Sequence, residues 1–170
     1  MNCRSIASLV VLTAFCTAVH AQKPGAEPRI RAQTSKALDL FFDSGATGLQ
    51  KTIESCYATA QALADRERDP EASVERELSN ERCVALDHLG LILFVTQKRM
   101  METRFKKTFD DPFFNPQANE KRVAEYLELQ KFDEIKKKKF SEFVFGVVYD
   151  QYRKQLAARS TTSTEMPVSK

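Results

Sequence analysis

Apolar residues recur at steps of three and four along much of the chain, which is the spacing that places them on one face of an α-helix. A short helix is predicted to start at Ser35 and to end at Gly45, because serine caps helix starts and glycine commonly follows helix ends. Thr47 and Gln50 form a capping box that opens a second helix. The apolar stripe of this second helix consists of Leu49, Ile53, Cys56, Tyr57, Ala60, Leu63 and Ala64.

A long third helix is predicted to begin at Pro70, since Asp69 supplies a cap and proline suits the first helical position. A serine and an asparagine at 79–80 compete with the backbone for hydrogen bonds and leave a pause open there. Nothing else interrupts the helical pattern up to Phe105. Residues 89–95 are apolar nearly all round, which is typical of a central helix that other helices surround.

Two prolines within 108–116 exclude a continuous helix, so this segment is the longest irregular connection predicted inside the domain. Asn115 and Pro116 repeat the signal of a cap followed by proline and open a fourth helix. That helix is expected to end or bend at residues 131–133. The final helix has a broad apolar face that must be covered, formed by Phe140, Phe143, Val144, Val147, Val148, Tyr152 and Leu156.

The helical periodicity, with no pair of alternating runs joined by a tight turn, predicts an all-α fold. We expect a single-domain bundle of about five helices over residues 34–158, a length that suits one domain with a substantial core. Residues 22–33 contain Pro24, Gly25 and Pro28 and no apolar period, so they are predicted to be a flexible lead-in. Residues 159–170 lack both period and apolar content and are predicted to be a disordered tail.

Residues 1–21 have the order of a secretory signal peptide: a positive charge at Arg4, an apolar stretch, and a small-residue cleavage site ending at Ala21. The apolar stretch is much shorter than the roughly 20 residues that cross a membrane. We therefore expect neither a retained anchor nor membrane insertion after cleavage of the leader. The mature protein is expected in the periplasm, with secretion as the alternative.

Removal of the leader leaves two cysteines, Cys56 and Cys83, and one histidine, His88. In an oxidising compartment two cysteines form a disulfide more readily than a metal site, because structural zinc requires four ligands. We expect a Cys56–Cys83 disulfide that joins the second and third helices. A redox pair is the alternative, but Cys56 lies on an apolar stripe, whereas redox cysteines are partly exposed and usually follow a Cys-x-x-Cys spacing.

Charge and motifs argue against several function classes. The chain has 26 Lys and Arg against 23 Asp and Glu, with the two signs interspersed, which is not the one-sided balance of a nucleic-acid-binding protein. The sequence contains no recognisable metal, nucleotide or nucleophile motif, so we expect no cofactor and no enzymatic activity. Two alternatives stay open: an acid pair formed only in three dimensions, and His88 acting as a lone base rather than lying at a core edge.

Residues 110–116 are the strongest candidate for a binding site. They combine two acidic residues, Asp110 and Asp111, with the adjacent aromatics Phe113 and Phe114 in a connection stiffened by proline. Rigid aromatic anchors with a charged rim are typical of protein-binding surfaces. The alternative is that both phenylalanines pack back over the helix ends as part of the core.

A small helical domain with a leader, a Cys56–Cys83 pair and no catalytic set resembles the periplasmic immunity proteins that protect bacteria from type VI secretion amidase effectors. The resemblance implies a protein partner, a cell-wall hydrolase whose active site is blocked, often by a protruding loop. Residues 110–116 would be that loop, and capture would be one-to-one or through a homodimer. Two alternatives belong to other classes: an envelope chaperone or secretion-apparatus subunit with a long apolar groove, and an enzyme whose concave site gathers His88 with carboxylates.

Overall fold

The protein is all-α in the residues that its computed structural model describes, which are 25–64 and 70–164. Four helices and no strand occur in this part of the chain: α1 (Ala26–Ala64), α2 (Pro70–Arg104), α3 (Pro116–Leu129) and α4 (Glu134–Thr164). The all-α prediction is confirmed, and α2 and α3 begin at the prolines that the sequence patterns indicate. The predicted signal peptide and its cleavage site lie outside the described residues.

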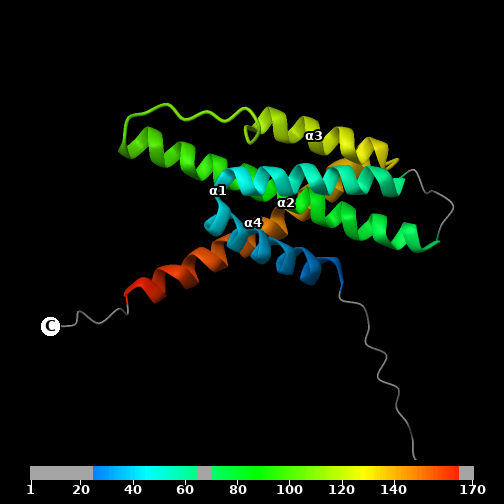
Figure 1. Cartoon of the computed structure of the whole chain (residues 1–170), viewed down its shortest axis with the longest axis horizontal. Coiled ribbons are helices and arrows are strands. Elements are labelled where there is room, and N and C mark those ends of the chain that lie inside the picture. The colour runs from blue at the N-terminus through cyan, green and yellow to red at the C-terminus, as the bar shows by residue number, and fades with distance from the viewer. Residues whose placement is uncertain (1–24, 65–69, 165–170) are drawn as a thin grey trace, which may run out of the picture.

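The predicted count of about five helices is wrong, because the first two predicted helices form one kinked helix. Gly45 has φ 68° and ψ −168°, a conformation that interrupts the helix without a loop. Glycine reaches a positive φ at no steric cost, whereas a side chain would be strained there. The sequence pattern therefore locates the break but not its form, since the chain changes direction at Gly45 and continues at once as helix (Figure 1).

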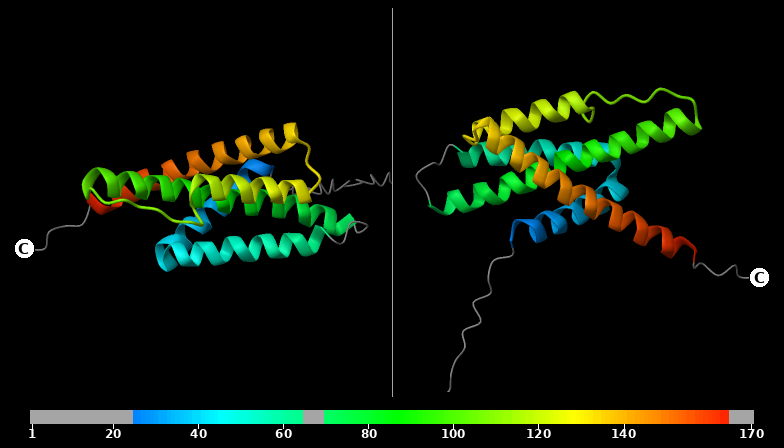
Figure 2. Two further views of the ribbon diagram at one scale, coloured as in Figure 1. Left: turned by 90° about the horizontal axis from the view of Figure 1, so that it is seen from above. Right: turned by 180° about the vertical axis from the view of Figure 1, so that it is seen from behind.

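α2 lies at the centre of the bundle, and the other helices pack around it (Figures 1 and 2). The second arm of α1, residues 46–64, runs antiparallel beside α2, and α3 lies along another side of α2. The first arm of α1, residues 26–44, turns away from this layer at the kink. It packs against α4, which crosses the bundle diagonally.

The segment 22–33, predicted as a flexible lead-in, is helical from Ala26 onward, so that prediction is wrong there. Pro28 does not break the helix, because N–H groups in the first turn have no acceptor within the helix. Ile30 is 1% exposed and belongs to the core. Arg29 pairs with the buried Glu81 of α2 at 2.6 Å, which ties this first turn to the bundle.

The C-terminal end also departs from the prediction of a disordered tail over 159–170. α4 continues to Thr164, six residues into that segment. Arg159 pairs with Asp39 of α1 at 2.6 Å, and its guanidinium carbon lies 4.0 Å from the ring centre of Phe42. These contacts between α1 and α4 stabilise a stretch whose apolar content alone does not predict a helix.

The core is centred on α2, as the nearly all-apolar run predicts. Every residue in 83–94 is buried except Leu91, which is half-buried. The other helices contribute their own apolar faces, and the face predicted for the final helix is only partly covered. In that face Val144 and Val148 are fully buried, whereas Phe143 is 44% exposed and Leu156 is 37% exposed.

The Cys56–Cys83 disulfide is confirmed. It joins the second arm of α1 to α2, with the two Cα atoms 5.5 Å apart. Cys56 is 6% exposed and Cys83 is completely buried, so the bond lies within the core. Redox-active cysteines are partly exposed, and this burial therefore favours the structural role.

Replacing both Cys56 and Cys83 with alanine should lower the free energy of unfolding by about 3 to 4 kcal/mol in the chain-entropy account. The physical reason is that the bond closes a loop between residues 27 positions apart, which restricts the unfolded chain. Urea unfolding of the variant and the parent protein measures the difference. A loss of less than about 1 kcal/mol would contradict a stabilising role.

Candidate functional site

The segment between α2 and α3, residues 105–115, lies along α2 rather than projecting from the bundle (Figures 1 and 2). The ring of Phe109 packs on Phe94 of α2, with the ring centres 5.5 Å apart. Phe114 is 5% exposed and sits over Gly90, where a β-carbon would lie 2.6 Å from the ring. The absence of a side chain at Gly90 therefore makes the space that Phe114 occupies.

Asp111 and Asn115 shape the end of this segment. The Asp111 carboxylate accepts hydrogen bonds from the backbone N–H groups of Phe113 at 2.9 Å and Phe114 at 3.1 Å. The Asn115 side chain accepts the N–H of Ala118 at 2.8 Å and thereby caps α3. These three bonds, accepted by two side chains from the backbone, convert the irregular connection into the first turn of α3.

Arg122 of α3 anchors the same segment through both its charge and its planar face. Its Nη1 donates to the carbonyl oxygen of Phe113 at 2.6 Å, and its guanidinium carbon lies 3.9 Å from the centre of the Phe113 ring. Its other nitrogens bind Asp87 of α2, with Nη2 2.5 Å from Oδ1 and Nε 3.1 Å from Oδ2. The Arg122 side chain therefore connects this segment to the buried carboxylate of Asp87 in α2.

Asp87 is 0% exposed and receives a third hydrogen bond from α1. The Tyr57 hydroxyl donates to Oδ2 of Asp87 at 2.9 Å. Burial first, and then the charge of Asp87, raise the pKa of Tyr57 well above its ordinary value, so the phenol keeps the proton that it donates. The carboxylate is consequently satisfied by two donor side chains from two different helices.

The four residues predicted to bind a partner have different surroundings in the structure. Asp110 is exposed, and Asp111 and Phe113 are half-buried. Phe114 is a core residue, so for this position the structure supports the packing alternative. Partner binding by Asp110, Asp111 and Phe113 stays a prediction, because these three side chains keep accessible surface.

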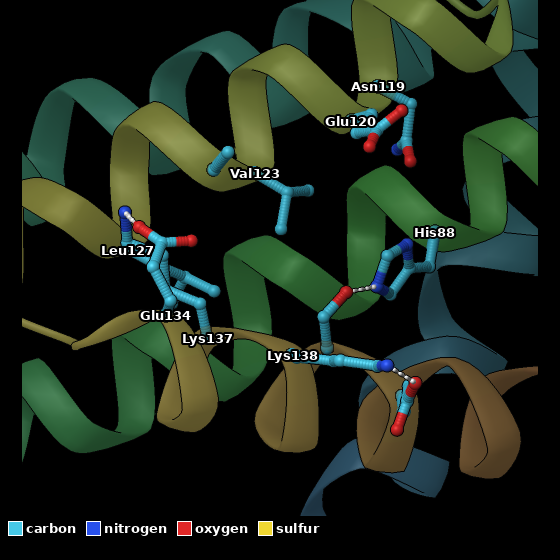
Figure 3. A pocket seen from close by; sticks show the side chains of 11 residues that line it. His88, Asn119, Glu120, Val123, Leu127, Glu134, Lys137 and Lys138 are labelled. Atoms are coloured by element: carbon cyan, nitrogen blue, oxygen red, sulfur yellow. Dashed lines mark hydrogen bonds and ion pairs between the residues drawn. The ribbon is translucent and has the colours of Figure 1, made fainter.

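A second candidate site is a pocket of about 400 Å³ between α2, α3 and α4 (Figure 3). Its inner wall combines polar and apolar side chains that are themselves buried, among them His88, Asn119 and Val123. Charged side chains line the outer part of the pocket. They are Glu120, Glu134, Lys137, Lys138 and Glu142.

His88 is 5% exposed and hydrogen-bonded to α4, with Nε2 3.0 Å from the Oγ of Ser141. The His88 ring and the end of the Asn119 side chain point toward each other in Figure 3. Nevertheless, neither Nδ1 of His88 nor Nδ2 of Asn119 has a hydrogen-bond partner among the described residues. Burial lowers the pKa of His88, and the nearby Asp87 charge acts in the opposite direction. The ring is therefore neutral at pH 7 and lies at the edge of the core.

The pocket gathers His88 with carboxylates, which is the arrangement that an enzyme of this sequence would require. A serine hydroxyl bonded to a histidine also resembles a pair of nucleophile and base. Acyl transfer further needs donors aimed at the developing oxyanion. Ser141 lies inside α4, where backbone N–H groups bond within the helix and offer no such donors. The arrangement is better suited to binding a polar group than to activating one.

The pocket is not predictable from the sequence because its polar residues are far apart in the chain. His88 and Ser141 are separated by 53 positions, and no spacing rule joins them. The available signal was local: Ser141 follows the lysines at 136–139 on a predicted helix, and His88 is the one histidine after residue 21. Neither feature predicts that the two side chains meet.

The described residues show neither a metal site nor a membrane span. Within 25–64 and 70–164, no group of three or more His, Cys, Asp or Glu side chains is placed to hold a metal ion. In the same ranges no helix combines the length and the apolar content needed to cross a bilayer. No protein-family model matches the sequence, and comparisons with curated proteins and with solved structures find no match either. The two candidate sites are therefore interpreted from their own geometry.

Gly90→Ala should destabilise the protein by about 1 to 3 kcal/mol, because the new methyl group would overlap the Phe114 ring and push the segment away from α2. Gly146→Ala is the matched control. Gly146 lies inside α4 with open space around it, so alanine there should stabilise the protein by about 0.5 to 1 kcal/mol. Thermal or urea unfolding compares the two variants, and a neutral Gly90→Ala would show that Phe114 does not occupy this space.

The protein should lose stability as the pH falls below 6.5, the ordinary histidine pKa. Below that value the unfolded chain takes up a proton at His88, while the folded chain, with its lowered pKa, resists doing so, and protonation therefore favours unfolding. Urea unfolding at about pH 7.5 and about pH 5.5 measures this slope. His88→Gln should flatten it, since no other histidine follows residue 21. Equal slopes in the two proteins would rule out the assignment to His88.

Proposed function

We propose that this protein is a periplasmic inhibitor of the immunity type, which binds a cell-wall amidase effector and blocks its active site. The observation that carries the proposal is the anchoring of residues 105–115 before any partner is bound. The ion pair of Arg122 with the buried Asp87, the turn at Asp111 and the insertion of Phe114 each restrict this segment. The small all-α body with one buried disulfide supports the same proposal.

A segment that is already ordered loses little conformational entropy when a partner docks, so more of the contact energy is retained as affinity. The accessible groups of this segment differ in chemistry: Asp110 offers a carboxylate, and Phe113 offers an aromatic ring stacked with Arg122. Aromatic residues and arginine are the residue types that contribute most at protein interfaces. In the proposed complex Phe114 acts only as the internal anchor of the segment.

The test is inhibition of a cell-wall amidase encoded next to the gene of this protein, measured as release of peptides from purified peptidoglycan. The mature chain should inhibit this amidase at a one-to-one ratio. A double variant, Asp110→Ala with Phe113→Ala, should inhibit at least about tenfold less well, because truncating central interface residues typically costs more than about 1.4 kcal/mol.

Phe143→Ala is the matched control, because Phe143 is an exposed phenylalanine on α4 rather than in the α2–α3 segment. This control should inhibit as well as the parent protein, and thermal unfolding should show all variants to be folded. Unchanged inhibition by the double variant would remove the segment from the interface. A neighbouring amidase that is not inhibited would contradict the immunity function, and binding of many unrelated clients would instead favour a chaperone.

A further inference from the structure

The pocket between α2, α3 and α4, called the α3–α4 pocket below, holds at its inner end two polar groups that the fold leaves unsatisfied. His88 is 95% buried and Asn119 is 97% buried, as their exposed fractions of 5% and 3% show. Both side chains line the pocket and point toward each other (Figure 3). Nδ1 of His88 and Nδ2 of Asn119 have no hydrogen-bond partner in the described part of the chain. Buried polar groups are nearly always hydrogen-bonded, so a pair of unsatisfied ones in a pocket indicates a missing partner.

The bond to Ser141 determines what His88 can offer the pocket. Other helical hydroxyls, such as those of Thr34 and Thr96, donate to the carbonyl four residues earlier, both at 2.8 Å. Ser141 instead bonds to Nε2 of His88, and this is its one hydrogen bond among the described residues. We take the tautomer in which the hydroxyl proton goes to Nε2 and this nitrogen is the unprotonated one of the neutral ring. Nδ1 then carries the ring proton and is a donor.

Two donors thus meet at the inner end of the pocket, the Nδ1–H of His88 and the amide N–H of Asn119. Two convergent donors are complementary to a single acceptor oxygen, as in a carbonyl or a carboxylate. The wall beside them is aliphatic, because Val123, Ala124 and Leu127 also line the pocket. This wall favours an aliphatic group next to the acceptor oxygen.

The charges around the pocket distinguish between a carbonyl and a carboxylate. Three carboxylates line the pocket, from Glu120, Glu134 and Glu142, against the two ammonium groups of Lys137 and Lys138. Both ammonium groups are already paired, Lys137 with Glu134 at 2.8 Å and Lys138 with Glu142 at 4.0 Å. An added anion would therefore meet a net negative rim, whereas an uncharged carbonyl would not.

We propose that the α3–α4 pocket binds a small amide whose uncharged carbonyl oxygen accepts hydrogen bonds from His88 and Asn119 while an aliphatic group packs on Val123 and Leu127. This site is separate from the α2–α3 segment of the proposed inhibitor function. A variant with Asp110→Ala and Phe113→Ala should accordingly bind the amide as the parent protein does. Failure of one proposal therefore leaves the other unaffected.

The test titrates isovaleramide into the mature, disulfide-intact protein and follows the imidazole nitrogen signals by NMR. No other histidine follows residue 21, so these signals belong to His88. In the free protein the ring proton should reside on Nδ1. Isovaleramide should shift the Nδ1 signal saturably, with a dissociation constant on the order of millimolar for so small a ligand. Isovalerate, which has the same shape and a negative charge, should bind at least about fivefold more weakly.

Variants distinguish binding at a specific site from nonspecific binding. Asn119→Leu keeps a similar volume without the donor and should weaken isovaleramide binding at least about tenfold. Ala124→Phe should block binding from an exposed position in the pocket and leave the His88 tautomer unchanged, which covers the case of an Asn119 variant that does not fold. Glu125→Gln, on the exposed face of α3, is the control and should bind normally.

Three results would overturn the proposal. The first is a ring proton on Nε2 in the free protein, which would remove one of the two donors. The second is the absence of a saturable shift up to about 50 mM isovaleramide. The third is equal affinity of isovaleramide and isovalerate, or equal affinity of the parent protein and a folded Asn119→Leu variant.

Discussion

Asp87 has no exposed surface, and the arrangement of three helices follows from the need to satisfy its charge. A buried carboxylate costs several kcal/mol of desolvation unless donors surround it. Here the donors are Arg122 of α3 and Tyr57 of α1, while Asp87 itself belongs to α2. A single carboxylate therefore fixes where α1 and α3 can lie against α2, and it does so with directional bonds rather than with apolar contact alone.

The position of the α2–α3 segment depends on the same ion pair. Arg122 has donors left over once Asp87 is bound, and one of them holds the Phe113 carbonyl. On the other side of the network Tyr126 of α3 donates to Asn80 of α2 at 2.5 Å, and its ring packs at a tilt against Tyr57, with ring centres 4.8 Å apart. The proposed binding surface is thus a consequence of a buried network, which explains how a segment without regular structure can be held in one conformation.

Local signals in the sequence predicted much of the fold. Caps followed by proline marked the starts of α2 and α3, and the expectation of export, together with the two cysteines after residue 21, predicted the disulfide. Gly45 was recognised as a break, but whether a break becomes a loop or a kink depends on how the two arms pack. The lead-in was mispredicted because Ile30 and Arg29 are stabilised by residues of α2 far along the chain.

The candidate sites were less predictable, because they too depend on contacts between residues that are far apart in the chain. The segment 110–116 was visible as a cluster of prolines, acids and aromatics, but the burial of Phe114 depends on Gly90, 24 positions earlier. Arg122 and Asp87 are 35 positions apart, and each alone is an ordinary charged residue on a helix. Pairings of this kind depend on how whole helices pack together. The periodicity of a single helix therefore does not predict them.

Hydrogen exchange at the backbone amides of Phe113 and Phe114 tests most directly whether the Asp87–Arg122 pair holds the segment in place. Arg122→Gln should lower the free energy of unfolding by about 3 to 5 kcal/mol, because it leaves a buried charge unpaired, and should accelerate exchange at both amides. Lys121→Gln, which removes only an exposed pair with Glu125, should leave both amides protected. Unchanged protection of both amides in a folded Arg122→Gln protein would contradict the account.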